Sequence, residues 1–127
     1  MSDTVARWHA YVDGRDPAAL DALLADEVVF RSPAVHTPQV GRAITARYLT
    51  AAMEVLGNDA FRYAGEWRAA RSAVLEFRTE VGGFEVHGID MIGWDDDGRI
   101  TEFTVMVRSM KALHAVVAAM GAALASG

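Results

Sequence analysis

The spacing of apolar residues changes near Asp59, and this change limits the folds that the chain can adopt. Up to Asp59 they recur every three or four positions, as in "SDTVARWHAYVDG" and "RAITARYLTAAMEVLG", which is typical of amphipathic helices. Beyond it they alternate, as in "SAVLEFRTEV", which is typical of strands with one buried face. The final apolar stretch, "ALHAVVAAMGAALA", indicates a packing helix. This order predicts an α+β domain with helices on one face of an antiparallel sheet.

Capping residues indicate where the first two helices begin. The first helix is expected to start after Ser2 or Asp3, either of which can cap it, and to end at Gly14. The second helix is expected to start with Asp16 as the N-cap and Pro17 at the first helical position. The backbone N–H that proline lacks would have no partner within the helix at this position.

A short strand and a longer helix are predicted between residues 27 and 57. "EVVFRS" is rich in β-forming residues and is stopped by Pro33, and the loop "AVHTPQVG" follows it. In the helix after this loop, helical spacing predicts an inward face formed by Ile44, Tyr48, Ala52 and Val55.

The dipeptide Gly82–Gly83 predicts a two-residue hairpin turn, and such a turn fixes the pairing of the strands that it joins. In this register Leu75 lies opposite Asp90, so the Asp90 side chain is expected to point inward from the apolar stretch "GFEVHGIDMIGW". An ionised carboxylate that is buried without a partner is costly. Asp90 is therefore expected either to act in a pocket, with a raised pKa, or to be paired with Arg108 or hydrogen-bonded to a Trp or Tyr.

A set of aromatic side chains is expected to face the interior. Alternation over residues 59–69 places three of them on one face of a strand and the charged Glu66 on the opposite face. Most inward aromatic side chains serve as core, but an aromatic wall with a few polar groups is also typical of a site for apolar ligands. Two or three of the following are expected to contact a ligand: Trp8, Tyr48, Phe61, Tyr63, Trp67 and Phe77.

The composition argues against several classes of partner. A net charge of −5 without any run of Lys and Arg argues against nucleic acid. No cysteine, no histidine pair with ligand spacing and no phosphate-binding glycine loop occur, so neither a metal nor a cofactor is expected. The apolar stretch over residues 112–125 is shorter than the ~20 residues that span a bilayer, so no membrane partner is expected. A cytoplasmic location is predicted.

Three phrases of the sequence resemble the nuclear transport factor 2-like superfamily, in its SnoaL-like and ketosteroid isomerase-like branches. They are "DGRDPAALDALLADEVVFRSP", "GRAITARYL" and "GIDMIGWDDDGRITEFTVMVR". The resemblance implies one SnoaL-like domain over residues 1–127, a cone in which a curved antiparallel sheet wraps around helices (also called cystatin-like), with a pocket at the wide end. It also implies a homodimer through the outer face of the sheet, where Val74, Ile89 and Met91 are apolar.

The resemblance also implies roles for particular residues. Asp90 resembles the acid of the ketosteroid isomerases, which apolar surroundings keep protonated so that it can donate a hydrogen bond to an oxyanion. Ser32 occupies the position of their base and Trp8 the position of their tyrosine, so two of the three catalytic parts differ. His36 is expected at the pocket rim and is a candidate for the missing base, because histidine titrates near neutral pH. The alternative is an exposed loop histidine.

Two kinds of function follow from these features. The first is a cofactor-free isomerase, cyclase or lyase that uses acid–base chemistry on an apolar carbonyl or polyketide-like substrate. In it Asp90 is the acid or base and His36 its proton partner, while Ser32, Tyr48 and Tyr63 orient the substrate. The second is a module without chemistry, which either binds an apolar small molecule in the same pocket or serves only to dimerise.

Overall fold

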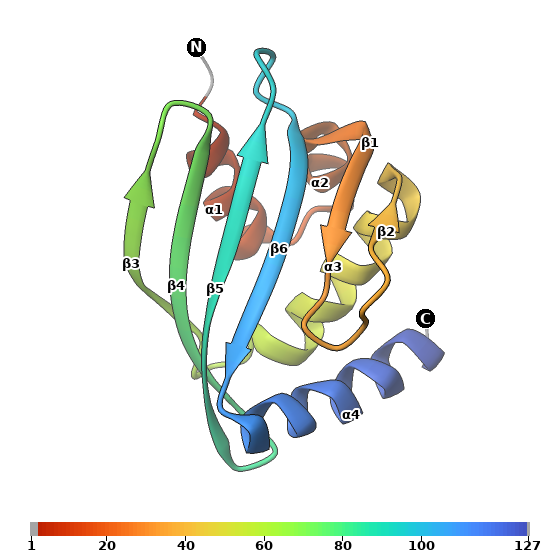
Figure 1. Ribbon diagram of the computed structural model, residues 1–127, viewed down its shortest axis with the longest axis vertical. Coiled ribbons are helices and arrows are strands. Elements are labelled where there is room, and N and C mark those ends of the chain that lie inside the picture. The colour runs from red at the N-terminus through yellow and green to blue at the C-terminus, as the bar shows by residue number, and fades with distance from the viewer. Residues whose placement is uncertain (1–2, 127) are drawn as a thin grey trace.

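The computed structural model describes residues 3–126, which form a curved six-stranded sheet and four helices (Figure 1). The α+β class and the curved sheet predicted from the sequence are confirmed. The elements in chain order are α1 (Thr4–Gly14), α2 (Pro17–Leu23), β1 (Leu24–Arg31), β2 (Gln39–Val40), α3 (Arg42–Leu56), β3 (Arg62–Arg68), β4 (Ser72–Val81), β5 (Phe84–Trp94), β6 (Ile100–Arg108) and α4 (Met110–Ser126).

The strand order of the sheet is β2-β1-β6-β5-β4-β3. Strands β3 to β6 form an antiparallel meander, as expected of an antiparallel sheet, and β2 is a short antiparallel neighbour of β1. β1 and β6 run parallel, so the predicted antiparallel sheet contains one parallel pair. This pair joins an early strand to the last one, a pairing between distant segments that no local sequence pattern specifies.

Both N-terminal helices begin at predicted capping residues. The Asp3 carboxylate accepts a hydrogen bond from the Ala6 amide at 3.1 Å, and this bond satisfies one of the free donors at the start of α1. Asp16 caps α2 in the same way through the Ala18 amide, at 3.0 Å. Ser2, the alternative cap of α1, lies outside the described residues.

β1 begins at Leu24, earlier than the predicted start at Glu27. Leu24 has an extended backbone and lies opposite Ile100 of β6. Both side chains are fully buried. Burial against the last strand therefore ends α2 sooner than its helix-forming sequence indicates, because tertiary packing overrides the weak local propensity.

α3 buries a broader stripe than the predicted face. Of that face Ala52 is buried, whereas Ile44, Tyr48 and Val55 are only half-buried. α3 contacts the sheet, α2 and α4, so it has neighbours on several sides. Its buried side chains are Thr45, Leu49, Ala51, Ala52, Met53 and Leu56.

The predicted hairpin register between β4 and β5 is confirmed. Gly82 and Gly83 form the turn with φ angles of 59° and 82°, which side-chain-bearing residues rarely adopt. The pairing sets Leu75 opposite Asp90. Asp90 consequently points toward the helices and is only 5% exposed.

A β-bulge interrupts the alternation of β3. Tyr63 lies opposite Phe77, but Gly65 lies opposite the adjacent Glu76, so one residue of β3 has no partner. Beyond the bulge, each side chain points to the opposite face from the one that simple alternation gives. Trp67 is therefore on the outer face, where it is 60% exposed, and its predicted inward direction is wrong.

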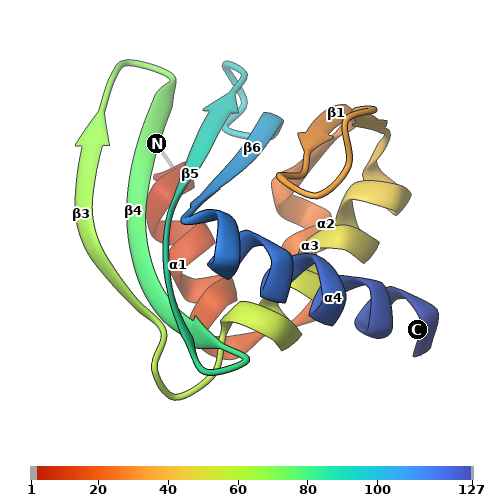
Figure 2. The same cartoon turned by 60° about the horizontal axis from the view of Figure 1, so that its bottom comes forward.

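α4 lies across one end of the molecule, next to α3 (Figure 2). It also contacts β4, β5 and β6, so it covers the interior between the sheet and α3 at this end. Its buried side chains Ala112, Val116 and Met120 pack into the hydrophobic core.

Replacing Gly88 with alanine should destabilise the protein, because a Cβ there would lie 2.5 Å from both the Met106 carbonyl oxygen and the Phe77 ring. We expect Gly88→Ala to lower the free energy of unfolding by about 3 kcal/mol, as overpacking does. Gly93 on the same strand is the matched control, since the nearest atom to a Cβ there is 3.8 Å away. Gly93→Ala should change the stability in urea denaturation by less than about 0.5 kcal/mol. Equal effects of the two substitutions would contradict the close contact at Gly88.

Candidate functional site

Three side chains from three elements form a buried hydrogen-bonded chain. The indole Nε1 of Trp8, on α1, donates to the hydroxyl of Tyr63, on β3, at 2.8 Å. The same hydroxyl donates to Oδ2 of Asp90, on β5, at 2.7 Å. Trp8 and Asp90 are 1% and 5% exposed, so the chain ends on a carboxyl group that is sealed from bulk solvent.

The strand register explains how Tyr63 and Asp90 meet across two strand pairs. Tyr63 precedes the bulge and lies opposite Phe77, which in turn lies opposite Gly88. Asp90 is two positions further along β5 and therefore on the same face as Gly88. Because Gly88 has no side chain, the Phe77 ring fills the space next to it on the helix side of the sheet.

Burial determines the protonation of Asp90. Desolvation disfavours the charged carboxylate and raises its pKa to about 7, although the hydrogen bond from Tyr63 acts in the opposite direction. A substantial fraction of Asp90 is therefore neutral at neutral pH. Burial also raises the pKa of Tyr63 far above its usual range, and the adjacent Asp90 carboxylate adds to this effect. Tyr63 thus keeps its proton and acts as a donor.

A protonated Asp90 has one oxygen atom free to act on a ligand. Oδ2 accepts the hydrogen bond from Tyr63, and no residue in the described part of the chain binds Oδ1. Asp90 borders a cavity of about 10 Å³, enough for about one water molecule. A neutral carboxyl group in such a place can donate its proton to an oxygen atom of a ligand. The other lining residues are Trp8, Leu49, Ala52, Met53, Leu56, Phe61, Phe77, Phe103 and Val105.

A second apolar cavity, of about 20 Å³, is lined in part by Val116 and Met120 of α4. It shares Ala52, Leu56 and Val105 with the first cavity, so the two cavities are adjacent. Together they mark an apolar path from Asp90 to α4 and the loop after β1. The remaining lining residues are Phe30, Ser32, Pro33, Ala34, Val107, Val116 and Met120.

Four of the predicted binding residues lie around Asp90. Trp8 and Tyr63 belong to the hydrogen-bonded chain. Phe61 and Phe77 line the first cavity, with their rings stacked at a centroid distance of 5.7 Å. The structure therefore brings together residues from α1, β3, β4 and the segment before β3 around one carboxyl group.

The other predicted site residues lie elsewhere. Ser32 lines the second cavity, and Tyr48 packs its ring 5.7 Å from Phe30 without lining either cavity. Trp67 is on the outer face of the sheet. His36 is exposed in the loop between β1 and β2 and lines neither cavity. The roles of Tyr48 and His36 in a site remain predictions.

The partner of Asp90 is a tyrosine, one of the predicted alternatives, and not an arginine. Asp90 lies opposite Val105 of β6, whereas Arg108 lies opposite His87, on the other face and near the end of the strand. An arginine would have held the pKa of the carboxyl low by its charge. With a neutral partner, burial dominates and the pKa is raised.

His9 lies beside the site, although no sequence pattern indicates this. Its ring packs edge-on against Tyr63 at a centroid distance of 5.0 Å, and its Nε2 is 3.1 Å from Oε1 of Glu66. Glu66 faces the helices because of the bulge, against the prediction from alternation. Hydrogen bonds from Arg68 and His9 lower the pKa of Glu66. The available sequence signal for the bulge is Gly65, since an isolated glycine in a strand often marks one.

The described residues, 3–126, contain neither a metal-ligand cluster nor a membrane-spanning helix. Within this range no group of three His, Cys, Asp or Glu side chains is arranged to hold a metal ion. In the same range no helix is long and apolar enough to cross a membrane.

Comparison with known proteins gives these features a family context. A family model described as a SnoaL-like domain matches residues 5–103. The structure is similar to a steroid delta-isomerase from Pseudomonas aeruginosa, with 45% identity, a TM-score of 0.91 and coverage of 97% of this chain and 90% of that one. It is also similar to an uncharacterised protein with a cystatin-like fold from Silicibacter pomeroyi, with 32% identity, a TM-score of 0.87 and coverage of 96% and 85%. A nuclear transport factor 2-like protein of unknown function from Mesorhizobium loti shares the fold at 23% identity, with a TM-score of 0.71 and coverage of 84% and 88%. Among curated proteins there is no match.

The pKa of Asp90 predicts a pH dependence of stability that Asp90→Asn removes. The value is about 7 in the folded protein and ~3.9 in an unfolded chain. Between these values the folded protein holds a proton that the unfolded chain has lost. The stabilisation is therefore complete at low pH and is lost as the pH rises toward 7, by up to about 1.4 kcal/mol per pH unit.

Urea denaturation of both proteins from about pH 4 to about pH 8 measures this effect. Contributions from other titrating groups cancel in the difference between the two proteins, because the substitution leaves those groups in place. A difference that does not vary with pH would contradict the raised pKa of Asp90.

Proposed function

This chain belongs to the SnoaL-like domain family, and we propose that it is a cofactor-free, isomerase-type enzyme that polarises the carbonyl group of an apolar substrate. The observation that carries the proposal is the carboxyl group of Asp90, which is buried, receives one hydrogen bond from Tyr63 and has a free second oxygen. The 45% identity to a protein named as a steroid delta-isomerase supports this type of reaction.

In this mechanism Asp90 acts in its neutral form. Its protonated Oδ1 donates a hydrogen bond to the carbonyl oxygen of the substrate. When a proton leaves the carbon next to the carbonyl, the electron pair moves onto this oxygen, and the hydrogen bond strengthens as negative charge develops. Return of the proton to a different carbon then shifts the double bond, with no net gain or loss of atoms.

Trp8 and Tyr63 favour Oδ1 of Asp90 as the atom that carries the proton. An indole nitrogen can only donate, so the Tyr63 hydroxyl accepts from Trp8 and directs its own proton to Asp90. Oδ2 of Asp90 is thereby occupied as an acceptor, and a proton on the carboxyl group belongs on Oδ1. Trp8 therefore acts as a positioning residue, through Tyr63.

His36 is the base in this proposal, because the Ser32 hydroxyl cannot remove a carbon-bound proton unaided. The two residues lie close in sequence, with Ser32 at the second cavity and His36 in the exposed loop that follows. The reacting carbon lies next to the carbonyl group that Asp90 binds, so this loop has to fold inward for the His36 imidazole to reach it. A polyketide-like substrate suits the same chemistry, since ring closure through an enolate also needs a stabilised oxyanion.

A second candidate function is binding without chemistry. It is favoured by Ser32, which stands at the position of the base. In this case Asp90 donates a hydrogen bond to an apolar small molecule, and no bond is broken.

A cytoplasmic location, expected from the absence of cysteine, remains a prediction.

We also propose that two copies of the chain associate through the outer face of the sheet. Trp67, Val74 and Met91 are consecutive partners across β3, β4 and β5, and Ile89 lies opposite Met106 in the next row. Trp67, Met91 and Met106 are 60%, 40% and 48% exposed. A contiguous exposed apolar row of this kind is typical of a protein–protein interface.

The Asp90→Asn substitution tests the proposed reaction. An amide is a far weaker acid than a neutral carboxyl group, so we expect turnover of enolisable apolar ketones to fall at least about 100-fold while the protein stays folded. Ultraviolet absorbance of the conjugated product, followed over a panel of unsaturated ketones, measures the rate. Asp59→Asn, at an exposed position, is the matched control.

The pH–rate profile gives a second readout of the same proposal. Activity should fall as the pH rises through the pKa of Asp90, about 7. Tyr63→Phe removes the hydrogen bond that lowers this pKa, so the fall should move to higher pH. Full activity of Asp90→Asn would refute the role of Asp90 as the catalytic acid. Ligand binding without turnover in the wild type would support the second function.

The Trp67→Lys substitution tests the interface. A lysine at the β3 end of the apolar row should raise the dissociation constant of the dimer at least about tenfold, measured by sedimentation equilibrium. Val117→Lys is the control, since Val117 is 39% exposed and lies on α4 instead of the sheet. A wild-type protein that is monomeric at high concentration would contradict the proposed dimer.

A further inference from the structure

We propose that α4 is a lid over the apolar interior and must move away from α3 before a ligand can reach Asp90. The inference rests on the proposed function, because it concerns access to the same carboxyl group.

The closed interior is too small for the proposed substrate. The two cavities along the path from Asp90 have volumes of about 10 and 20 Å³. Pockets that bind small organic molecules usually enclose about 300–1,000 Å³. A ligand larger than water therefore requires a wall of the interior to move.

α4 is the wall that can move at least cost. The second cavity is lined by β1, β6, the loop after β1, α3 and α4. The strands are tied to their neighbours by ladder hydrogen bonds along their length, and α3 is buried from several sides. α4 belongs to no ladder and buries only Ala112, Val116 and Met120 among its described side chains. Moving it breaks side-chain contacts but leaves the sheet intact.

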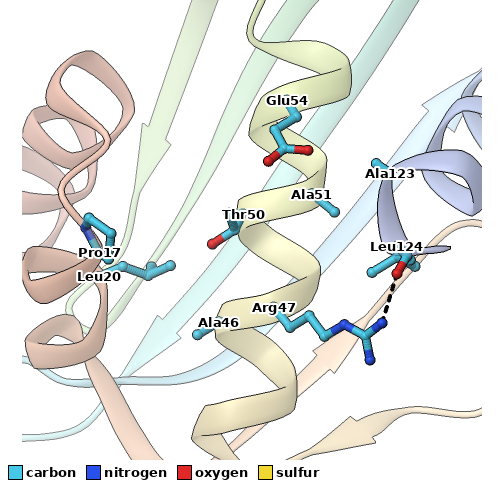
Figure 3. A pocket seen from close by; sticks show the side chains of 9 residues that line it. All are labelled: Pro17, Leu20, Ala46, Arg47, Thr50, Ala51, Glu54, Ala123 and Leu124. Atoms are coloured by element: carbon cyan, nitrogen blue, oxygen red, sulfur yellow. Dashed lines mark hydrogen bonds between the residues drawn. The ribbon is translucent and has the colours of Figure 1, made fainter. Parts of the chain in front are cut away.

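A hydrogen bond joins the C-terminal half of α4 to α3. Arg47 Nη2 donates to the carbonyl oxygen of Leu124 at 2.8 Å, and Figure 3 shows this bond spanning the two helices. An open groove of about 280 Å³, lined by α2, α3 and α4, runs beside it. The side chains of α4 that face the groove, Ala123 and Leu124, are only half-buried. The Arg47 bond thus acts as a latch on a half-buried helix end.

Val116 and Met120 are the side chains of α4 that line the second cavity, and Met120 is the one that can change shape most easily. It lines the second cavity and is 7% exposed. A methionine side chain is unbranched and flexible, so it can fill the space when the lid is closed and leave it when the lid opens. Met110, on the same helix, is 74% exposed and supplies a matched control.

Stopped-flow binding of prodan, a neutral aromatic ketone whose emission reports the polarity of its surroundings, tests the lid. If opening precedes binding, the observed rate levels off at high prodan concentration. Arg47→Met removes the latch and should raise this plateau about fivefold, a shift that the loss of one hydrogen bond commonly gives. Arg7→Met is the control, because Arg7 likewise donates to a backbone carbonyl, that of Ala22, but joins α1 to α2.

The substitutions Met120→Ala and Met110→Ala test the role of the Met120 side chain. Met120→Ala should bind prodan more tightly than the wild type, because it leaves room beneath the closed lid. Met110→Ala should bind it as the wild type does. Equal affinities of all three proteins would overturn the role of Met120.

Hydrogen exchange of the free protein tests the lid without a ligand. The amides of residues 110–126 should exchange about fivefold faster in Arg47→Met than in the wild type, and those of β4 and β5 should not change. If Arg47→Met leaves the exchange rates of the α4 amides unchanged, the lid is overturned, regardless of the result of the prodan binding experiment. A binding rate that rises linearly with prodan concentration would also overturn it and leave the proposed function intact. If α4 exchange rises as expected but prodan binds neither the wild type nor Met120→Ala, the motion is supported and the proposed function is contradicted.

Discussion

The burial of Asp90 is the constraint on which the rest of the site depends. A charged carboxylate among apolar side chains would be costly, and the structure lowers this cost in two ways. Tyr63 donates a hydrogen bond to one oxygen, and the raised pKa allows the group to be neutral. Because Trp8 supplies the Tyr63 hydroxyl with a donor in turn, α1 has to pack against the sheet at this point. The same contacts that accommodate the carboxyl group also give it the properties of an acid.

The apolar surroundings that raise the pKa of Asp90 also exclude a ligand from the closed structure. An acid that donates to a developing oxyanion works best where water is absent, because electrostatic interactions are stronger there. The volume beside Asp90, about 10 Å³, satisfies this condition but leaves no room for a substrate. A movable helix end resolves the conflict, since it allows the interior to be closed during chemistry and open during exchange of ligand. α4, which belongs to no strand ladder, is the element that fits this role.

The accuracy of the sequence-based predictions depended on how local the deciding interactions are. The direction of Asp90 was predictable because Gly82 and Gly83 accept positive φ angles and thereby set the register of the strands beside them. The direction of Trp67 was not, because a bulge between Tyr63 and Gly65 reverses the alternation of β3. The hydrogen bond from Tyr63 to Asp90 joins residues on strands that are not neighbours in the sheet, and no spacing rule gives it.

The sequence by itself determined the order of the helices and of every strand except the short β2, which lies in a predicted loop. It also determined the hairpin that turns Asp90 inward and, through its matching phrases, the family. These features follow from periodicity, capping and turn chemistry, which act over a few residues. Only the tertiary structure decided the parallel pairing of β1 with β6, the bulge that moves Trp67 outward and Glu66 inward, and the contact of three distant side chains at Asp90. The physical reason is that packing between distant segments sets these features, and its energy outweighs the local preferences that a sequence pattern displays.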